Sequence, residues 1–205
     1  VQARGLSNVV EFRATDNLTL KNIVSYRDSD TTTPIDFDSL PIIDLDVATE
    51  YRDHQFSEEF QALYEGDRLS GVLGFYYLSA NARNDFDVLL SGGATNVFTS
   101  SDVDTRTWSI FGDFSFDLTD RLSVAVGGRY TQDERSIFLR RQIFVNNGVT
   151  FPLGTLSPSL GGPPRPPLLT QTNLLAEADF EDFSPRASIS YEFSDEHTGY
   201  VSYAK

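Results

Sequence analysis

The feature that most constrains this chain is a pair of adjacent segments, residues 107–134, in which apolar and polar side chains alternate. A period of two is typical of a β-strand whose two faces meet different surroundings. The residues Leu118-Thr119-Asp120 separate the two segments, so the sequence predicts an antiparallel hairpin. Each arm has about 11 residues, the length that a tilted strand needs to cross a bilayer. Phe111 is the one apolar residue on the polar parity of the first arm.

The same alternation predicts strands elsewhere in the chain. The predicted strands outside this hairpin cover residues 7–15, 18–30, 51–64, 69–83, 183–193 and 198–204, and the hairpin's outer end extends to about residue 141. Long loops are predicted at residues 31–48, 84–104 and 142–182, where Pro, Gly, Asp and Ser are frequent. The run from Leu73 to Leu78 is apolar on both parities, and Glu58 lies on the apolar parity of its strand. The faces of those two strands are therefore not predicted.

Short and long connections alternate along the chain, which places every short turn at one end of a meander. Outer-membrane barrels have this arrangement, with short periplasmic turns and long extracellular loops. A soluble β-sandwich is the alternative, but its strands run to about 5–6 residues, roughly half the length predicted here. We therefore predict an all-β antiparallel meander of about eight long strands, an incomplete segment of a large transmembrane β-barrel. Its edges are predicted at residues 7–15 and 198–204, without closure.

Composition agrees with a sheet that is apolar on one face. The apolar fraction is 40%, below the roughly 45–50% of a globular domain. No apolar run approaches the 18 or so residues of a spanning helix, which excludes a helical membrane protein. The net charge of −14 argues against nucleic acid as a partner, because nucleic-acid binding requires a basic surface. The chain has no Cys, so disulfides and thiolate metal sites are excluded.

In a barrel, the two parities assign side chains to lipid or to lumen. The predicted lipid-facing residues are Leu122, Val124, Val126, Tyr130, Ala187, Ile189 and Tyr191. The predicted lumen-facing residues are Ser123, Arg129, Thr131, Arg186, Ser188 and Glu192. The assignment keeps Arg off the lipid face, where it costs about 2–4 kcal/mol at the bilayer midplane.

No catalytic, cofactor or metal site is predicted. His54 and His197 lack ligand spacing to a second His. The pairs Asp44/Asp46, Asp85/Asp87 and Asp102/Asp104 could bind Ca²⁺ in principle, but none has the EF-hand pattern, and solvated loop charge is favoured. Glu58 and Glu59 are adjacent in a strand and point to opposite faces, so they cannot act as a carboxylate pair on one substrate. An enzyme is therefore not expected.

Several segments together resemble the TonB-dependent receptors of Gram-negative outer membranes, in the middle of their barrel domain. The most specific is Phe116-Asp117-Leu118-Thr119-Asp120-Arg121-Leu122 followed by Gly127-Gly128-Arg129-Tyr130-Thr131. Others are residues 18–26, 56–60, 71–78, Phe183-Ser184-Pro185-Arg186 and residues 200–205. The resemblance spans nearly the whole chain, and it rests on the order and spacing of these segments.

The resemblance implies a barrel of about 22 strands with a plugged lumen. Residues 1–205 would then be part of that barrel, without the plug domain, the energy-coupling box and the remaining strands. The implied function is active uptake of a scarce nutrient, most commonly a ferric siderophore, coupled through the inner-membrane TonB protein. The implied partners are outer-membrane lipid, the plug domain, TonB and a small-molecule ligand. A passive or structural barrel, and a secreted sandwich that binds glycans, are the alternative functions.

Overall fold

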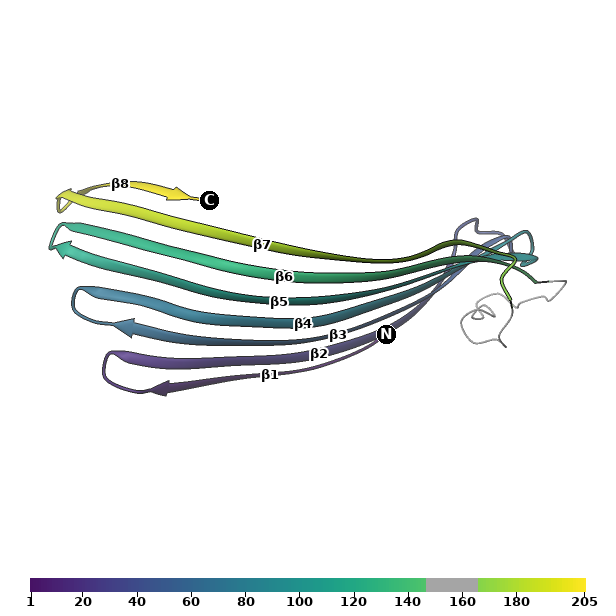
Figure 1. Ribbon diagram of the computed structural model, residues 1–205, viewed down its shortest axis with the longest axis horizontal. Helices are drawn as coiled ribbons and strands as arrows, with labels where there is room; N and C mark the ends of the chain where they lie inside the picture. The colour runs from purple at the N-terminus through teal and green to yellow at the C-terminus, as the bar shows by residue number, and fades with distance from the viewer. Residues whose placement is uncertain (147–165) are drawn as a thin grey trace.

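Eight antiparallel strands form one sheet in the order β1-β2-β3-β4-β5-β6-β7-β8 (Figure 1). The computed structural model describes residues 1–146 and 166–205. The strands are β1 (Gln2–Arg13), β2 (Leu18–Asp36), β3 (Leu45–Glu65), β4 (Leu69–Leu90), β5 (Thr95–Thr119), β6 (Leu122–Val145), β7 (Leu169–Ser194) and β8 (His197–Ala204). The predicted eight-stranded meander is confirmed.

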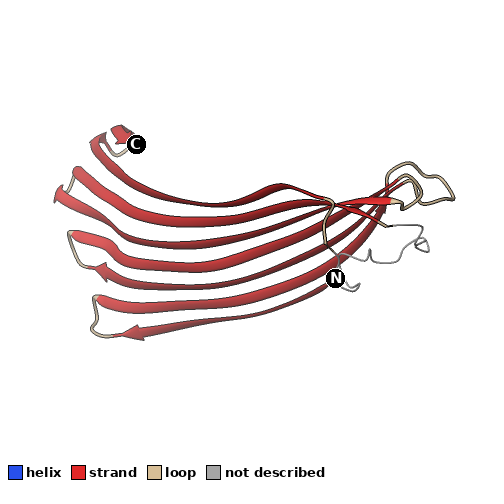
Figure 2. Ribbon diagram, turned by 45° about the vertical axis from the view of Figure 1, so that its right-hand side comes forward, coloured by secondary structure: helices blue, strands red, loops and turns tan. Residues whose placement is uncertain are grey.

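The sheet is curved and open, with β1 and β8 at opposite edges (Figure 2). Val10 pairs with Asn22 of β2, and Val201 pairs with Ile189 of β7. No strand of a second sheet covers either face in the described ranges, so the β-sandwich alternative does not fit this fold. No helix long and apolar enough to cross a membrane occurs in the part of the chain that the structure describes.

The short turns gather at one end of the sheet, as predicted. They comprise residues 14–17, 66–68, 120–121 and 195–196, and lie together at the left of Figure 1. In the first of these turns, the backbone N–H groups of Ala14 and Thr15 both donate to the Leu18 carbonyl, at 2.9 and 3.2 Å. The connections of residues 37–44 and 91–94 lie at the opposite end.

The predicted lengths of the long loops are wrong. β2 and β3 stay paired as far as Asp36 and Asp46, so the first connection has only residues 37–44. β4 and β5 run through the predicted loop 84–104 and are joined by residues 91–94, a tight turn in which Ser91 (φ 55°), Gly92 (φ 67°) and Gly93 (φ 78°) have positive φ. β7 begins at Leu169, inside the third predicted loop; residues 147–165 of that loop lie outside the described residues.

These errors have one physical cause. The segments are rich in Asp, Asn, Ser and Thr, which favour turns in isolation. In the sheet, each backbone N–H and C=O finds its partner on the neighbouring strand, so local turn preference is overridden. Strands β2 to β7 consequently contain 19–26 residues, about twice the length that a bilayer requires.

The sheet has little interior of its own. The buried apolar residues are Val47, Ala48, Leu89 and Phe98, all at the end of the sheet opposite the short turns. Most of the large apolar side chains elsewhere are exposed, including Phe12, Leu73 and Ile110, which are 63%, 52% and 51% accessible. An apolar face of this extent is stable only when another apolar phase covers it.

Candidate functional site: two faces of one sheet

Strand register, rather than parity alone, determines which side chains share a face. On β5, β6 and β7, Phe116, Val124 and Ile189 are in register, and Ile110, Tyr130 and Phe183 are in register closer to the middle of the strands. All seven residues of the predicted lipid-facing set (Leu122, Val124, Val126, Tyr130, Ala187, Ile189 and Tyr191) therefore share one face. The predicted lumen-facing set (Ser123, Arg129, Thr131, Arg186, Ser188 and Glu192) lies on the other.

The first face carries an apolar band across all eight strands. Ile110 is in register with Phe75 on β4, which is in register with Phe60 on β3, so the band continues onto both strands. This identifies the apolar faces of β3 and β4, which the sequence did not predict. We define the apolar band by its large members: Leu6, Val10, Phe12, Leu18, Leu20, Val24, Tyr26, Phe56, Phe60, Tyr64, Leu69, Leu73, Phe75, Tyr77, Trp108, Ile110, Phe114, Phe116, Leu122, Val124, Val126, Tyr130, Phe183, Ile189, Tyr191, Val201 and Tyr203. Its border away from the short turns is aromatic, with Tyr77 and Trp108 in register.

Glu58 belongs to the face of the apolar band, as its parity indicates. It is in register with Tyr77 of the aromatic border. The side-chain amide of Asn22 donates to its Oε1 at 3.1 Å. This carboxylate lies between Phe56 and Phe60 of the band, and its hydrogen-bond partner reduces the cost of placing it beside apolar side chains.

The opposite face, which we call the polar face, carries ion pairs and hydrogen bonds between strands. Lys21 Nζ lies 2.8 Å from Glu11 Oε1, and the Ser123 hydroxyl donates to Asp117 at 2.5 Å. Arg186 of β7 pairs with Asp113 of β5, although β6 runs between them. The residue in register between the two is Gly127, and a Cβ there would overlap the Asp113 carboxylate. The glycine thus leaves the space in which the pair forms.

The structure explains why Phe111 departs from the alternation. Its ring lies over Gly74, where any Cβ would overlap it. The Arg129 guanidinium carbon lies 5.5 Å from the centre of the Phe111 ring and 5.7 Å from that of the Tyr76 ring. Both distances are in the range of cation–π attraction. Phe111 is therefore an aromatic support for an arginine on the polar face, and sequence parity could not reveal this.

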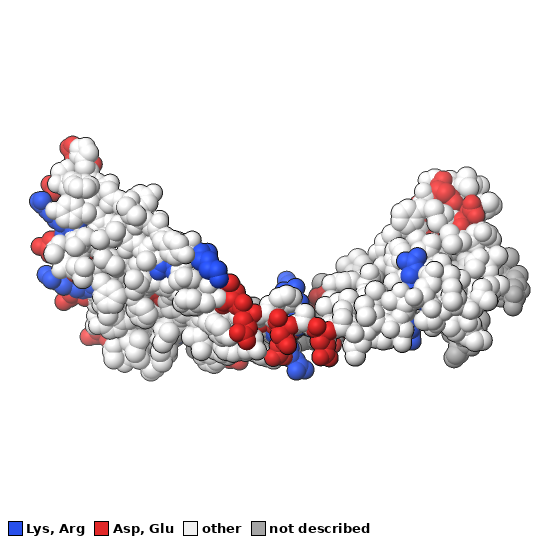
Figure 3. Space-filling model, turned by 45° about the horizontal axis from the view of Figure 1, so that its top comes forward, with Lys and Arg blue, Asp and Glu red and all other residues white. Residues whose placement is uncertain are grey.

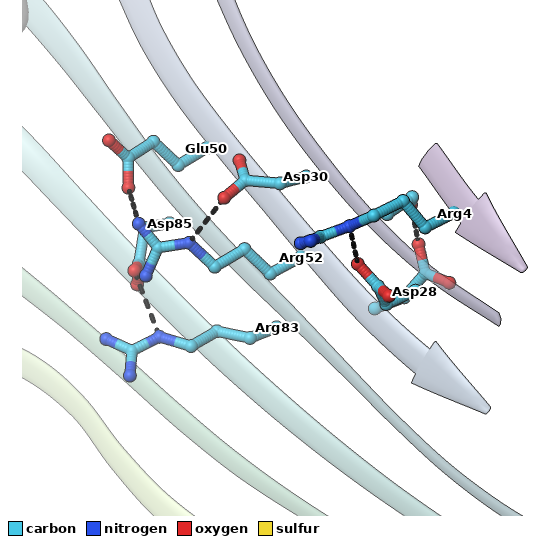
Figure 4. Close-up of polar contacts among 9 residues, drawn as sticks. Arg4, Asp28, Asp30, Glu50, Arg52, Arg83 and Asp85 are labelled. Atoms are coloured by element: carbon cyan, nitrogen blue, oxygen red, sulfur yellow. Dashed lines mark hydrogen bonds and ion pairs between the residues drawn. The ribbon is translucent and has the colours of Figure 1, made fainter. Parts of the chain in front are cut away.

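Beyond the aromatic border, the two faces exchange polarity. On the face of the apolar band, the next rows are charged and hold a series of ion pairs (Figure 4). Arg52 contacts Asp30 at 3.3 Å and Glu50 at 2.9 Å, while Arg83 contacts Asp85 at 3.0 Å. Figure 3 shows acidic side chains gathered at the narrow middle of the molecule. The opposite face there becomes apolar, with Ala82, Val103, Ile137 and Ala176 in register.

The sequence did not predict this charged belt (Asp30, Glu50, Arg52, Arg83 and Asp85), because the predicted strands ended at residues 30, 51 and 83, where the belt begins. The sequence does contain a signal for it. Apolar and polar residues continue to alternate through residues 79–83, with Ala80 and Ala82 on one parity and polar residues on the other.

Several of the Asp and His residues considered as metal ligands contact other protein groups. The Asn81 amide donates to Asp102 at 2.6 Å and to Asp104 at 3.0 Å, and the Asn96 amide donates to Asp87 at 2.7 Å. His197 lies beside a turn, with its Nδ1 3.0 Å from the Ser194 hydroxyl. No group of three or more His, Asp or Glu side chains that could hold a metal ion occurs within residues 1–146 and 166–205.

The turn between β2 and β3 concentrates negative charge. Asp36 and Asp46 are in register on neighbouring strands. Burial, and then the nearby Asp36 and Asp38 carboxylates, raise the pKa of Asp46 above its ordinary value of 3.8. One carboxylate oxygen of Asp46 is also buried and has no hydrogen-bond partner among the described residues. This end of the sheet therefore has lower stability when Asp46 is ionised.

An open antiparallel sheet with one apolar and one polar face is the wall of a large transmembrane β-barrel, present here in part. The chain belongs to the TonB-dependent receptor family: the family model described as "TonB dependent receptor-like, beta-barrel" matches residues 3–205. Among curated proteins, none matches the chain.

Two solved structures share the fold. The ferric yersiniabactin uptake receptor FyuA from Yersinia pestis is 15% identical with a TM-score of 0.74; the alignment covers 98% of this chain and 27% of the receptor. The ferric-catecholate import receptor Fiu from E. coli K12, in an open form, is 10% identical with a TM-score of 0.59; the alignment covers 98% of this chain and 35% of the receptor. The chain therefore corresponds to about a third or less of those receptors.

We predict that Gly127→Ala destabilises the folded barrel by about 1–3 kcal/mol, the usual cost of overpacking. The new methyl group would displace the Asp113 carboxylate and break its pair with Arg186. Unfolding in denaturant would measure the loss. Gly5→Ala on edge strand β1, where the nearest atom is 3.3 Å from the added carbon, is the matched control and should be nearly neutral. Equal stability of the two variants would contradict this account of the pair.

We predict that Asp46→Asn stabilises the β2–β3 turn at pH 7. Because the pKa of Asp46 is raised in the folded state, the folded chain holds the proton more tightly than the unfolded chain. Its ionisation therefore lowers stability as the pH rises from 3.8 through the folded value, and the benefit of Asn should vanish below that window. We expect the variant to exchange its amide hydrogens across residues 36–46 more slowly than the unmodified protein at pH 7, and at the same rate below that pH window. Asp67→Asn, at the short-turn end, should change nothing there.

Proposed function

We propose that this chain is part of the wall of an outer-membrane receptor of a Gram-negative bacterium, one that takes up a scarce nutrient by active transport. In this proposal the apolar band faces outer-membrane lipid, and the polar face lines the lumen. The observation that carries the proposal is the continuity of the apolar band across eight strands, opposite a face of paired charges. Membership of the receptor family supports it.

The dimensions of the apolar band suit a bilayer. On β5 it runs from Trp108 to Phe116 and on β6 from Leu122 to Tyr130. This is about nine residues, close to the 9–11 of a tilted spanning strand. Tyr77, Trp108 and Tyr130 at its border suit the membrane interface, where amphipathic rings are enriched. Across the described strands, no Lys or Arg interrupts the band, as expected where Arg or Lys is costly.

The polar face suits a wide, hydrated lumen. A barrel closed at eight strands has an interior only just wide enough for side chains, whereas this face carries long charged groups such as Arg129, Arg186 and Lys21. Further strands and a plug domain in the full-length protein would complete and fill such a barrel. Wide transporter barrels of this kind have a plugged lumen.

A ferric siderophore is the ligand we favour, with energy supplied by the inner-membrane TonB protein acting through the plug. The two solved receptors that share the fold take up ferric yersiniabactin and import ferric catecholate, which supports an iron chelate. Because charges on the polar face such as Lys21 with Glu11 and Arg186 with Asp113 are paired with one another, we infer transport rather than catalysis, and the proposal involves no cofactor.

Uptake by the full-length receptor would test this function. Cells that express it should accumulate radiolabelled iron from a ferric siderophore, and accumulation should stop when TonB is deleted. A set of hydroxamate, catecholate and mixed chelates would define the ligand. Uptake that persists without TonB would favour a passive barrel instead, and uptake of none of the chelates would reject the iron chelate.

The face assignment predicts different tolerance at adjacent positions. Val124→Arg should destabilise the barrel by about 2–4 kcal/mol if Val124 lies near the bilayer midplane, whereas Ser123→Arg should be tolerated in a hydrated lumen. Reversible unfolding of the receptor in lipid vesicles would measure both. Because the two residues are neighbours on β6, the pair controls for strand position. Equal effects would mean that no bilayer covers the apolar band.

A further inference from the structure

Arg129 differs from the other basic residues near it on the polar face. Lys21 and Arg186 are each paired with a carboxylate of another strand, Glu11 of β1 and Asp113 of β5. Arg129 is held by the Phe111 and Tyr76 rings, and its one polar partner within the described residues is the Thr131 hydroxyl, 3.3 Å from Nε. The side chain is exposed and has no acidic partner in the described part of the sheet.

A second unsatisfied group lies beside it. Ser109 is in register between Tyr76 and Thr131, in the row next to that of Arg129. Its side chain is completely buried, and its hydroxyl has no hydrogen-bond partner within residues 1–146 and 166–205. A buried polar atom without a partner is uncommon in a folded protein and requires an explanation. Asp113, the nearest acid along β5, is already bound to Arg186.

The cluster has the chemistry of a carboxylate receptor. A guanidinium is planar and presents a fork of N–H donors that matches a carboxylate. The Phe111 and Tyr76 rings lie beside the Arg129 guanidinium and restrict its orientations, which lowers the side-chain entropy lost on binding. Gly74 is needed for this arrangement, because a side chain there would displace the Phe111 ring.

We propose that Arg129, supported by Phe111 and Tyr76, forms an ion pair with a carboxylate on another segment of the same polypeptide, one that occupies the lumen. This inference rests on the proposed function, which makes the polar face the lumen wall. A resident partner suits the site better than a transported ligand does. Conduction requires a ligand to leave each binding point readily, whereas this guanidinium is fixed in position at the depth of the apolar band.

Photo-crosslinking in the full-length receptor would test the proposal. Ser184, in register with Arg129 on β7, would be replaced by p-benzoylphenylalanine, and the crosslinked peptides identified by mass spectrometry. We expect a crosslink to an Asp- or Glu-containing segment outside residues 1–205. Arg129→Gln should lower its yield about tenfold, which corresponds to about 1.4 kcal/mol. Arg27→Gln is the matched control and should leave the yield unchanged, because Arg27 is hydrogen-bonded to the neutral Gln55 and to no carboxylate in the described part of the chain.

Any other result would contradict the proposed ion pair between Arg129 and a carboxylate of the same polypeptide. An unchanged yield in Arg129→Gln, or a crosslinked segment without Asp or Glu, would reject it while leaving the proposed function intact. A crosslink to an added ferric chelate alone would assign the carboxylate to the ligand. Crosslinks to lipid would contradict the lumen assignment itself, and with it the proposed function. If the crosslink depends on Arg129, changing the identified acid to its amide in the Arg129→Gln background should cause no further loss.

Discussion

The continuous backbone ladder between neighbouring strands is the constraint on which the rest of this structure depends. Within the long strand pairs the register shifts only near Asp117, Arg141 and Glu192. Because side chains alternate with a period of two, a slip of one residue would turn a whole strand's apolar side chains to the other face. The shifts lie near strand ends, so the register is continuous between them and converts eight separate patterns into one apolar band and one polar face.

This constraint also explains how much the sequence could predict. The hairpin of residues 107–134 and the strand around Ile189 have clean alternation, so their strands were predicted correctly. The run from Leu73 to Leu78 is apolar on both parities and carries no such information. Its face becomes clear only because Phe75 pairs with Ile110, a long-range fact that a local pattern does not contain.

The polar face was the harder part to predict, since its contacts join residues far apart in sequence. The need for glycine at position 127 follows from the Asp113 and Arg186 side chains on the two flanking strands. Likewise, the environment of Arg129 depends on Phe111, Tyr76 and the space over Gly74. In both cases a small residue accommodates a large or charged one from the next strand. Such compensation depends on register, so composition and local propensity cannot reveal it.

The exchange of polarity beyond the aromatic border follows from the same geometry. Side chains keep alternating along a strand that extends beyond the apolar band. Where the surroundings of that face change from apolar to aqueous, the face needs polar side chains. On the extended strands that requirement is met by Asp28, Asp30, Arg52 and Arg83, and by ion pairs such as Arg4 with Asp28 at 3.4 Å. Exposed pairs of this kind each contribute little to stability. The ladder itself therefore stabilises the extended strands, and the charges keep that surface hydrated. Loss of one belt arginine should accordingly disturb the local surface without unpairing the strands.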